Sequence, residues 1–179
     1  MSPNDFGVNG GWGGLRTTSA LVGKMAANDK RAMFYSNGQS LEISNIRRFT
    51  DGYAVTKFKN VTSSGQRGRD ASGNFVDTDV PLIRLSEIYL NYAEATLRGG
   101  NGSLTEALNR INQIRARAYG NTTGNIASTA LTLNFVLDER ARELFWEGQR
   151  RTDLVRYNHF TTNTYLWPFK GNAPSGSAV

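Results

Sequence analysis

Cysteine is absent from this 179-residue chain, and histidine occurs once, at His159. Without cysteine the chain can form no disulfide framework, and it has no thiolate to serve as a nucleophile or metal ligand. No apolar run approaches the ~20 residues that a membrane-spanning helix needs. Residues 1–10 have neither the basic nor the apolar region of a secretion signal. The composition, 39% hydrophobic and 20% charged, is typical of a globular domain.

Catalytic and metal-binding motifs are also missing. The sequence contains no GxSxG, P-loop, GxGxxG or HExxH pattern. Glycoside hydrolysis needs two carboxyl groups that face each other, but Glu87 and Glu94, seven residues apart, would point the same way about 10 Å apart along a helix. The loop aspartates Asp70, Asp77 and Asp79 lack the spacing of a calcium loop. We therefore expect no enzyme, no metal site and no cofactor.

The net charge of +6 and the pI near 9.8 raise the question of a nucleic-acid partner. The basic residues are dispersed, and in the second half of the chain most stand beside acids. No block of five or six like charges occurs, and no basic stripe alternates with aromatic residues. The pattern indicates a solvated surface with salt bridges, so no nucleic-acid partner is predicted.

The composition changes near Pro81. Residues 1–80 are rich in Gly, Asn, Ser and Asp and show little helical periodicity. Two partly apolar runs, Leu41–Phe49 and Tyr53–Phe58, flank an Asp-Gly pair at 51–52, which predicts a β-hairpin. A short helix is expected within Leu15–Ala27, and a long polar loop follows the hairpin. Residues 1–80 are thus expected to be a glycine-rich looped region with a hairpin.

Residues 81–179 have helical periodicity. A first helix around Leu85 carries one narrow polar stripe and ends at the Gly-Gly pair 99–100. Ser103 and Glu106 form a capping-box pattern for a second helix, and the short link predicts an antiparallel hairpin of the tetratricopeptide type. The fold class predicted is mainly α, with a small β-hairpin and long loops.

A third helix, expected from Leu133 to Gly148, is followed at once by a short fourth one near 150–158. Charged residues lie on both sides of the break, and a salt-bridge network that fixes this corner is the expected role. Those residues are Glu139, Arg142, Glu143, Arg150, Arg151, Asp153 and Arg156.

The aromatic residues are the best candidates for binding. Trp12 has glycines on both sides, with Asn9 and Arg16 as nearby polar groups. A sugar ring could stack on the indole while the polar groups bond its hydroxyls; the alternative is that Trp12 is tucked into the domain. Trp146 is expected to pack against another segment, and 165–169 is expected to dock on the domain more than to bind sugar.

Three segments together resemble one known family. RLSEIYLNYAEA, ALNRINQIRARA and ERARELFWEGQRRTDLVRYNHF occur in the order typical of the SusD/RagB family, and GGWGGLRTTSALV is similar to an earlier family segment. The resemblance covers roughly residues 10–170. It implies a SusD-like fold and a non-catalytic cell-surface lipoprotein. Such a protein binds oligosaccharide or polysaccharide at the outer membrane and delivers it to a TonB-dependent, SusC-like transport barrel.

The chain departs from the family pattern in three ways. The lipoprotein signal with its lipid-bearing cysteine, the N-terminal helical repeats and the closing segment are absent, which predicts a truncated C-terminal half of one domain whose lipid anchor belongs to the parent. Because sugar-binding residues vary in the family, only Trp12, Asn9 and Arg16 are carried over as glycan ligands. An apolar patch around Tyr89 and Tyr92, extending to Leu97, is expected to be exposed. The alternative function is a helical-repeat module that binds protein and has no sugar site.

Overall fold

The computed structural model describes residues 2–11, 14–70 and 72–179. The chain divides into two units. The first holds Met1–Val22 and Met33–Val80, and the second holds Gly23–Ala32 and Pro81–Val179. Pro81, where the composition changes, therefore begins the main part of the second unit, which also takes in the short segment 23–32.

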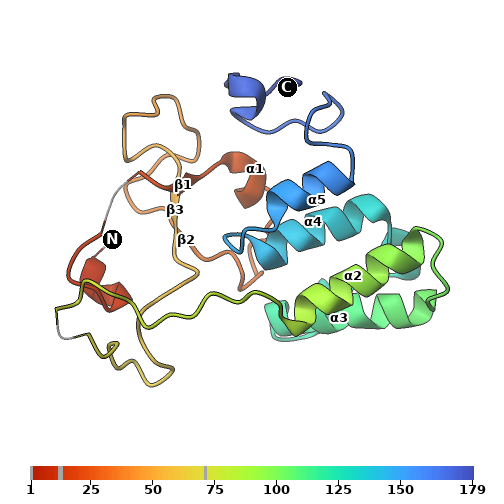
Figure 1. Cartoon of the computed structure of the whole chain (residues 1–179), viewed down its shortest axis with the longest axis horizontal. Helices are drawn as coiled ribbons and strands as arrows, with labels where there is room; N and C mark the ends of the chain where they lie inside the picture. The colour runs from red at the N-terminus through yellow and green to blue at the C-terminus, as the bar shows by residue number, and fades with distance from the viewer. Residues whose placement is uncertain (1, 12–13, 71) are drawn as a thin grey trace. The chain divides into compact units, whose positions relative to one another are not determined.

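The first unit is built on a small antiparallel sheet (Figure 1). Its central strand is β3 (Tyr53–Val55), with β1 (Arg16–Thr17) and β2 (Phe34–Tyr35) on its two sides. A four-residue helix, α1 (Ser19–Val22), follows β1, and a 3₁₀ turn spans Pro3–Phe6. Long loops join these pieces, as the glycine-rich composition predicts.

The predicted hairpin is wrong in one of its two strands. Residues 53–55 do form a strand, but they pair with β1 and β2 and not with Leu41–Phe49, which forms a loop. The reason lies in Asp51, whose carboxylate accepts hydrogen bonds from the amide and hydroxyl of Ser44 and from the amide of Asn45. These local bonds compete with a strand ladder and curl the segment instead. The helix expected within Leu15–Ala27 is reduced to α1.

The second unit contains the longer helices: α2 (Leu85–Leu97), α3 (Leu104–Tyr119), α4 (Leu133–Leu144) and α5 (Arg150–Arg156). Helix α2 packs against both α3 and α4 (Figure 1). Short 3₁₀ turns span Thr122–Gly124, Ser128–Ala130 and Lys170–Asn172. The mainly α fold class is confirmed. The central core residues are Leu90, Ala93, Ala107, Ile111, Ile114, Leu131, Val136 and Leu144.

The link between α2 and α3 matches the predicted helical hairpin. Gly99, with φ 93°, lies in the left-handed region that favours glycine. Ser103 caps α3, and its hydroxyl accepts the amide of Glu106 at 3.3 Å. The Ser103 amide donates to the hydroxyl of Tyr92 at 2.9 Å, while the Glu106 carboxylate pairs with Arg110 at 2.5 Å. The tyrosine thus bonds an amide at the α3 N-terminus from the facing helix.

One face of α2 is apolar and exposed. Tyr89 and Leu97 pack against the core, so the expected patch does not include them as exposed residues. The exposed residues are Leu85, Ile88 and Tyr92. Their spacings of three and four place them on one side of the helix. We call these three residues the α2 stripe.

The α2 stripe is expected to bind a hydrophobic dye, because contiguous exposed apolar surface marks interaction sites and dye sites alike. Ile88→Lys should lower dye fluorescence while changing the free energy of unfolding by less than about 0.5 kcal/mol, as for other surface substitutions. Val155→Lys on α5 is the matched control, since Val155 is 52% exposed and Ile88 48%. Equal dye binding by both variants would show that the stripe is not the dye site.

Candidate functional site

The sequence places its candidate glycan site in the first unit, between residues 9 and 16. Trp12, the predicted stacking residue, lies outside the described residues, so its role stays a prediction. Asn9 and Arg16, its predicted polar partners, are described, and each is fastened to a different loop. Their contacts fix residues 9 and 16, which flank the glycine-rich segment.

Arg16, on strand β1, fastens the loop that precedes β3. Its Nε donates to the Gly14 carbonyl at 3.3 Å and its Nη2 to the Ile46 carbonyl at 2.9 Å. Its Nη1 donates to the carbonyls of Arg48 and Asp51. Four of the five guanidinium N–H groups therefore bond backbone oxygens. The side chain positions the surrounding backbone, and its direct contact with sugar stays a prediction.

Asn9 fastens a second loop. Its Nδ2 donates to the carbonyl of Ser72, its Oδ1 accepts from Arg67 at 2.8 Å, and its backbone amide donates to the Gly73 carbonyl at 3.3 Å. A Cβ on Gly73 would lie 2.5 Å from the Asn9 side chain, so glycine is required at this close approach. Like Arg16, Asn9 shapes the loop, and a role as a sugar ligand stays untested.

Two aromatic segments of the second unit are the other candidates that the sequence offers. Trp146 is 48% exposed with φ 62°, so the expected packing of this side chain is wrong. Helix α4 ends at Leu144, and Phe145 takes the buried position at the turn. Tyr165 docks as expected: its ring stacks on His159 at 5.1 Å between centroids, and its hydroxyl donates to Asp138 at 2.9 Å.

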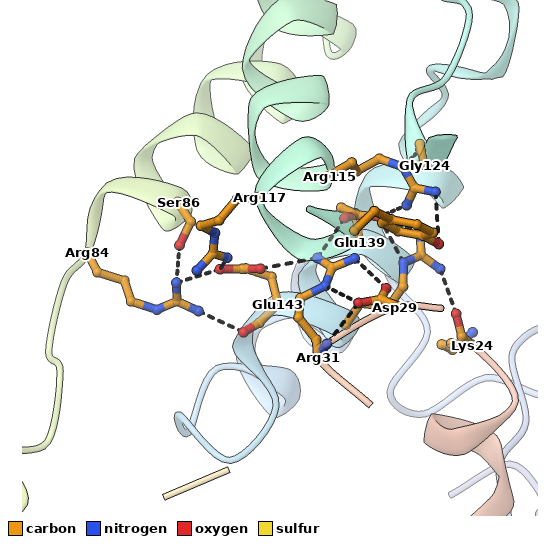
Figure 2. A network of polar contacts seen from close by, with 12 residues as sticks. Lys24, Asp29, Arg31, Arg84, Ser86, Arg115, Arg117, Gly124, Glu139 and Glu143 are labelled. Carbon is orange, nitrogen blue, oxygen red and sulfur yellow. Dashed lines mark hydrogen bonds and ion pairs between the residues drawn. The ribbon is translucent and has the colours of Figure 1, made fainter. Parts of the chain in front are cut away.

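The predicted charge network at α4 is a cluster of buried carboxylates (Figure 2). Glu139 forms ion pairs with Arg31 at 2.8 Å, with Arg115 at 2.7 Å and with Arg142 at 2.7 Å. Arg31 is further held by Asp29, which accepts its Nε at 2.9 Å and its Nη2 at 2.7 Å. Segment 23–32 and helices α3 and α4 are thereby joined through one carboxylate.

Glu143, one turn further along α4, forms the second centre of the cluster. It accepts from Arg84 at 2.6 Å, from Arg117 at 2.5 Å and from Arg31 at 3.1 Å. Arg84 also pairs with Glu147 at 2.7 Å and precedes the first turn of α2. The N-terminus of α2 is therefore fixed to the end of α4 (Figure 2).

The arginines decide the protonation of these carboxyl groups. Burial by itself raises the pKa of Glu139, but the charges of Arg142, Arg31 and Arg115 outweigh burial, and the pKa is lowered. For Glu143, burial would also raise the pKa. The hydrogen bond from Arg84 and the charges of the neighbouring arginines outweigh burial and lower the pKa to about 2. A general acid needs a raised pKa. Neither residue is suited to that role, and both are held ionised.

A second charge cluster joins α5 to α2. Asp153 accepts from Arg140 at 2.8 Å and from Arg156 at 2.8 Å. Arg156 reaches Glu94 on α2 at 2.7 Å, and Glu94 also pairs with Arg98 at 2.9 Å. The corner network expected from the sequence is confirmed only in part. The ion pair between Arg140 and Asp153 joins α4 to α5, whereas Glu139 and Glu143 pair with arginines that include several from outside the α4–α5 corner. Arg150 bonds the Leu137 carbonyl and the Tyr165 hydroxyl.

Two further findings bear on function. Among the residues that the structure describes, no group of three or more His, Cys, Asp or Glu side chains is placed to hold a metal ion. Within the same residues, each helix is too short or too polar to cross a membrane.

Comparison with known proteins gives consistent results. A sequence model of the SusD family matches residues 7–176. The starch-binding protein SusD of Bacteroides thetaiotaomicron is 41% identical over 170 residues, which is 93% of this chain and 28% of that protein. The chain therefore spans less than a third of the length of this curated relative.

Solved structures show the same fold. Surface glycan-binding protein A from Bacteroides thetaiotaomicron matches with a TM-score of 0.64 at 22% identity, over 98% of this chain and 38% of that one. The same protein in complex with laminarihexaose matches with a TM-score of 0.61 at 22% identity, over 87% and 34%. At this identity the likeness concerns the fold alone.

The buried carboxylates predict acid sensitivity of the second unit. Glu143 has an ordinary pKa of 4.5 and a folded-state pKa of about 2, so folding favours its ionised form. Its contribution to stability is full above pH 4.5 and is lost as the pH falls toward 2. The melting temperature should therefore drop in this window, and Glu143→Gln should flatten that drop.

Removing one partner of a buried ion pair should also cost about 3–5 kcal/mol at neutral pH. Glu106→Gln, which breaks a more exposed pair with Arg110, is the control and should cost no more than about 1 kcal/mol. The interpretation fails if melting between pH 4.5 and 2 has the same slope in Glu143→Gln as in the wild type.

Proposed function

The chain belongs to the SusD family, and from this premise we propose that it is a non-catalytic glycan-binding protein. The observation that supports this most is the 41% identity, along 93% of the chain, to a protein named for starch binding. A structural neighbour was solved in complex with laminarihexaose. Laminarihexaose, like starch, consists of glucose units, but the two differ in their glycosidic linkage. The ligand class proposed is therefore a glucan or a related oligosaccharide.

The ion pairs argue against a general-acid role for the buried glutamates of the helical unit. Hydrolysis of a glycosidic bond uses a carboxylic acid that is protonated at the working pH. Glu139 and Glu143 are both ionised by several arginines each, and Glu94 has its pKa lowered by hydrogen bonds from Arg156 and Arg98, against the effect of burial. These carboxylates stabilise the helical unit, and the glycan site is proposed for the first unit, at Trp12 with Asn9 and Arg16.

The finer role follows from the family resemblance. We propose that the parent protein is lipid-anchored at the outer surface of the outer membrane and delivers its oligosaccharide to a TonB-dependent, SusC-like barrel. The alternative, a helical-repeat module that binds protein, is supported by the exposed α2 stripe on a tetratricopeptide-type hairpin. A glycan-binding measurement separates the two, because only the first function requires a sugar site.

Incubation with starch or laminarin should leave both polysaccharides intact. The purified chain is expected to shift in an affinity gel that contains the polysaccharide, while an assay for reducing ends stays at the level of the buffer. New reducing ends released in proportion to the amount of pure protein would contradict the non-catalytic assignment.

Trp12→Ala is expected to weaken glycan binding by about 1 kcal/mol, or roughly fivefold, because a stacking ring is removed. Trp146→Ala serves as the matched control, since Trp146 is about half exposed and lies in the other unit. It should leave glycan affinity unchanged in the same titration. A loss confined to Trp146→Ala would place the site in the second unit and overturn the assignment.

A further inference from the structure

The charges of the second unit are arranged in two layers. The unit holds 14 lysines and arginines but only nine aspartates and glutamates, so it carries a net charge of +5 out of the chain's +6. The structure describes this unit completely, and every acidic residue in it is buried or half-buried. Five basic residues are exposed, namely Lys30, Arg98, Arg117, Arg151 and Arg156. The surface of the helical unit is therefore cationic, because its carboxylates lie beneath its guanidinium groups.

The ion pairs at the start of α2 show this layering at one place. Arg84 and Arg117 both donate to Oε1 of Glu143, so their guanidinium groups are neighbours (Figure 2). The side chain of Arg117 is 61% exposed, whereas that of Glu143 is 1% exposed. Arg84 also pairs with Glu147, whose side chain is 5% exposed. A ligand that approaches this surface thus meets the arginines before it meets the carboxylates.

Apolar side chains project from the surface around these two arginines. The residues that flank Arg84 in the chain are between 63% and 82% exposed, and they are Leu82, Ile83 and Leu85. Trp146 precedes Glu147, so the ion pair between Arg84 and Glu147 brings this ring to the same side of the unit. We call Leu82, Ile83, Arg84, Leu85, Arg117 and Trp146 the α2 N-terminal patch.

The backbone of Trp146 is a second, independent sign of a binding surface. Its φ of 62° lies in the left-handed region, which is costly for a large side chain and would suit glycine better. The ring is nevertheless about half exposed, so the strain is not offset by full burial in the core. Residues held in such conformations cluster at sites that contact ligands. Contact between this ring and a partner gives the strained tryptophan a role.

The shape and the chemistry of the patch decide between partners. A peptide helix binds in an apolar groove, but side chains that are more than 60% exposed project outward and line no groove. A lipid surface is fluid and adapts to projecting groups. Leucine and isoleucine can enter its acyl region, and tryptophan suits the interface between water and hydrocarbon. Exposed arginines beside them attract anionic headgroups and bond their phosphate oxygens.

We propose that the second unit docks on an anionic lipid surface through the α2 N-terminal patch. Leu82, Ile83 and Leu85 enter the outer part of the bilayer, while Arg84 and Arg117 bond headgroup phosphates at its surface. The contact is peripheral, and it orients the helical unit on the membrane. It requires no glycan, so the inference goes beyond the proposed function and can fail independently of it.

The test measures co-sedimentation of the full chain with two kinds of vesicle. One kind is phosphatidylcholine alone, and the other is an equal mixture of phosphatidylcholine and phosphatidylglycerol. Each arginine near an anionic surface adds to the attraction, so the wild type should bind the mixed vesicles about tenfold more tightly or better. Raising NaCl from about 0.1 M to about 0.5 M should remove most of this difference, because salt screens exposed charges.

Two leucines provide a matched pair of variants. Leu85 and Leu104 are the first residues of α2 and α3, and they are 63% and 60% exposed. Because α2 and α3 form an antiparallel hairpin, these residues lie at its opposite ends. Leu85→Ser should weaken binding to the mixed vesicles about five- to tenfold, since an inserted apolar side chain is lost. Leu104→Ser should leave it unchanged.

The arginine is tested with variants that separate its charge from its role in the fold. Arg117→Gln should weaken binding to the mixed vesicles about fivefold, while Arg117→Lys, which keeps the charge, should bind nearly as well as the wild type. Arg98→Gln removes an equal charge at the other end of α2 and should have little effect. Melting temperatures are recorded for every variant. The proposal is wrong if vesicle binding falls only in step with the melting temperature.

A label reports directly on insertion. The chain has no cysteine, so a single Ile83→Cys substitution can carry an environment-sensitive dye in one place. Its emission should shift to the blue with the mixed vesicles, and the same dye at Leu104→Cys should not shift. Equal shifts at both positions, or none at either, would overturn the proposed orientation.

The remaining outcomes separate this inference from its competitors. Equal affinity for the two kinds of vesicle, or equal losses in Leu85→Ser and Leu104→Ser, would contradict docking through the patch. A wild-type dimer that Leu85→Ser converts to a monomer, without vesicle binding, would assign the patch to contact between copies and overturn the proposal. Glycan binding without vesicle binding refutes the inference alone, and vesicle binding without glycan binding refutes the proposed function alone.

Discussion

The helical unit depends on two carboxylates, Glu139 and Glu143, that are buried and yet ionised. Burying a charge costs several kcal/mol unless partners replace the lost water, and here arginines from distant segments do so. Arg31 bonds both carboxylates, and Arg84 brings in the start of α2. Because an incompletely formed cluster would leave a buried charge unpaired, the segments that supply the arginines must assemble together.

In the first unit, charged and polar side chains also join distant segments, but they do so by bonding backbone groups. There three charged or amide side chains bond backbone groups. Arg16 and Asp51 hold the loop at residues 40–52, and Asn9 holds the loop at 72–73. Charged groups used in this way shape a surface without contributing a reactive group. Arg16, Asp51 and Asn9 thus determine the geometry of these loops.

Much of the helical unit could be predicted from the sequence, because helical periodicity, the Ser103 cap and the Gly-Gly stop are local signals. The hairpin prediction failed because Asp51 satisfies nearby backbone groups, which an Asp-Gly turn signal does not reveal. Arg31 could not be predicted as a partner of Glu139 and Glu143 because these two residues are more than a hundred residues away in the chain. The packing predicted for Trp146 was wrong because the helix ends two residues before it and Phe145 takes the buried position.

Glycine content alone would suggest that the first unit is flexible, but contacts made at two of its glycines give a structural reason for the residue type. Gly73 leaves room for the side chain of Asn9, and Gly14 leaves room for the ring of Phe49. At both positions φ is positive, so a larger residue would be strained, and at Gly73 it would also be crowded. These glycines let a side chain lie close to the backbone. Hydrogen bonds from Asn9 and Arg16 then hold the neighbouring loops in place. At Gly73, therefore, the absence of a side chain is what allows two segments of the first unit to lie in contact.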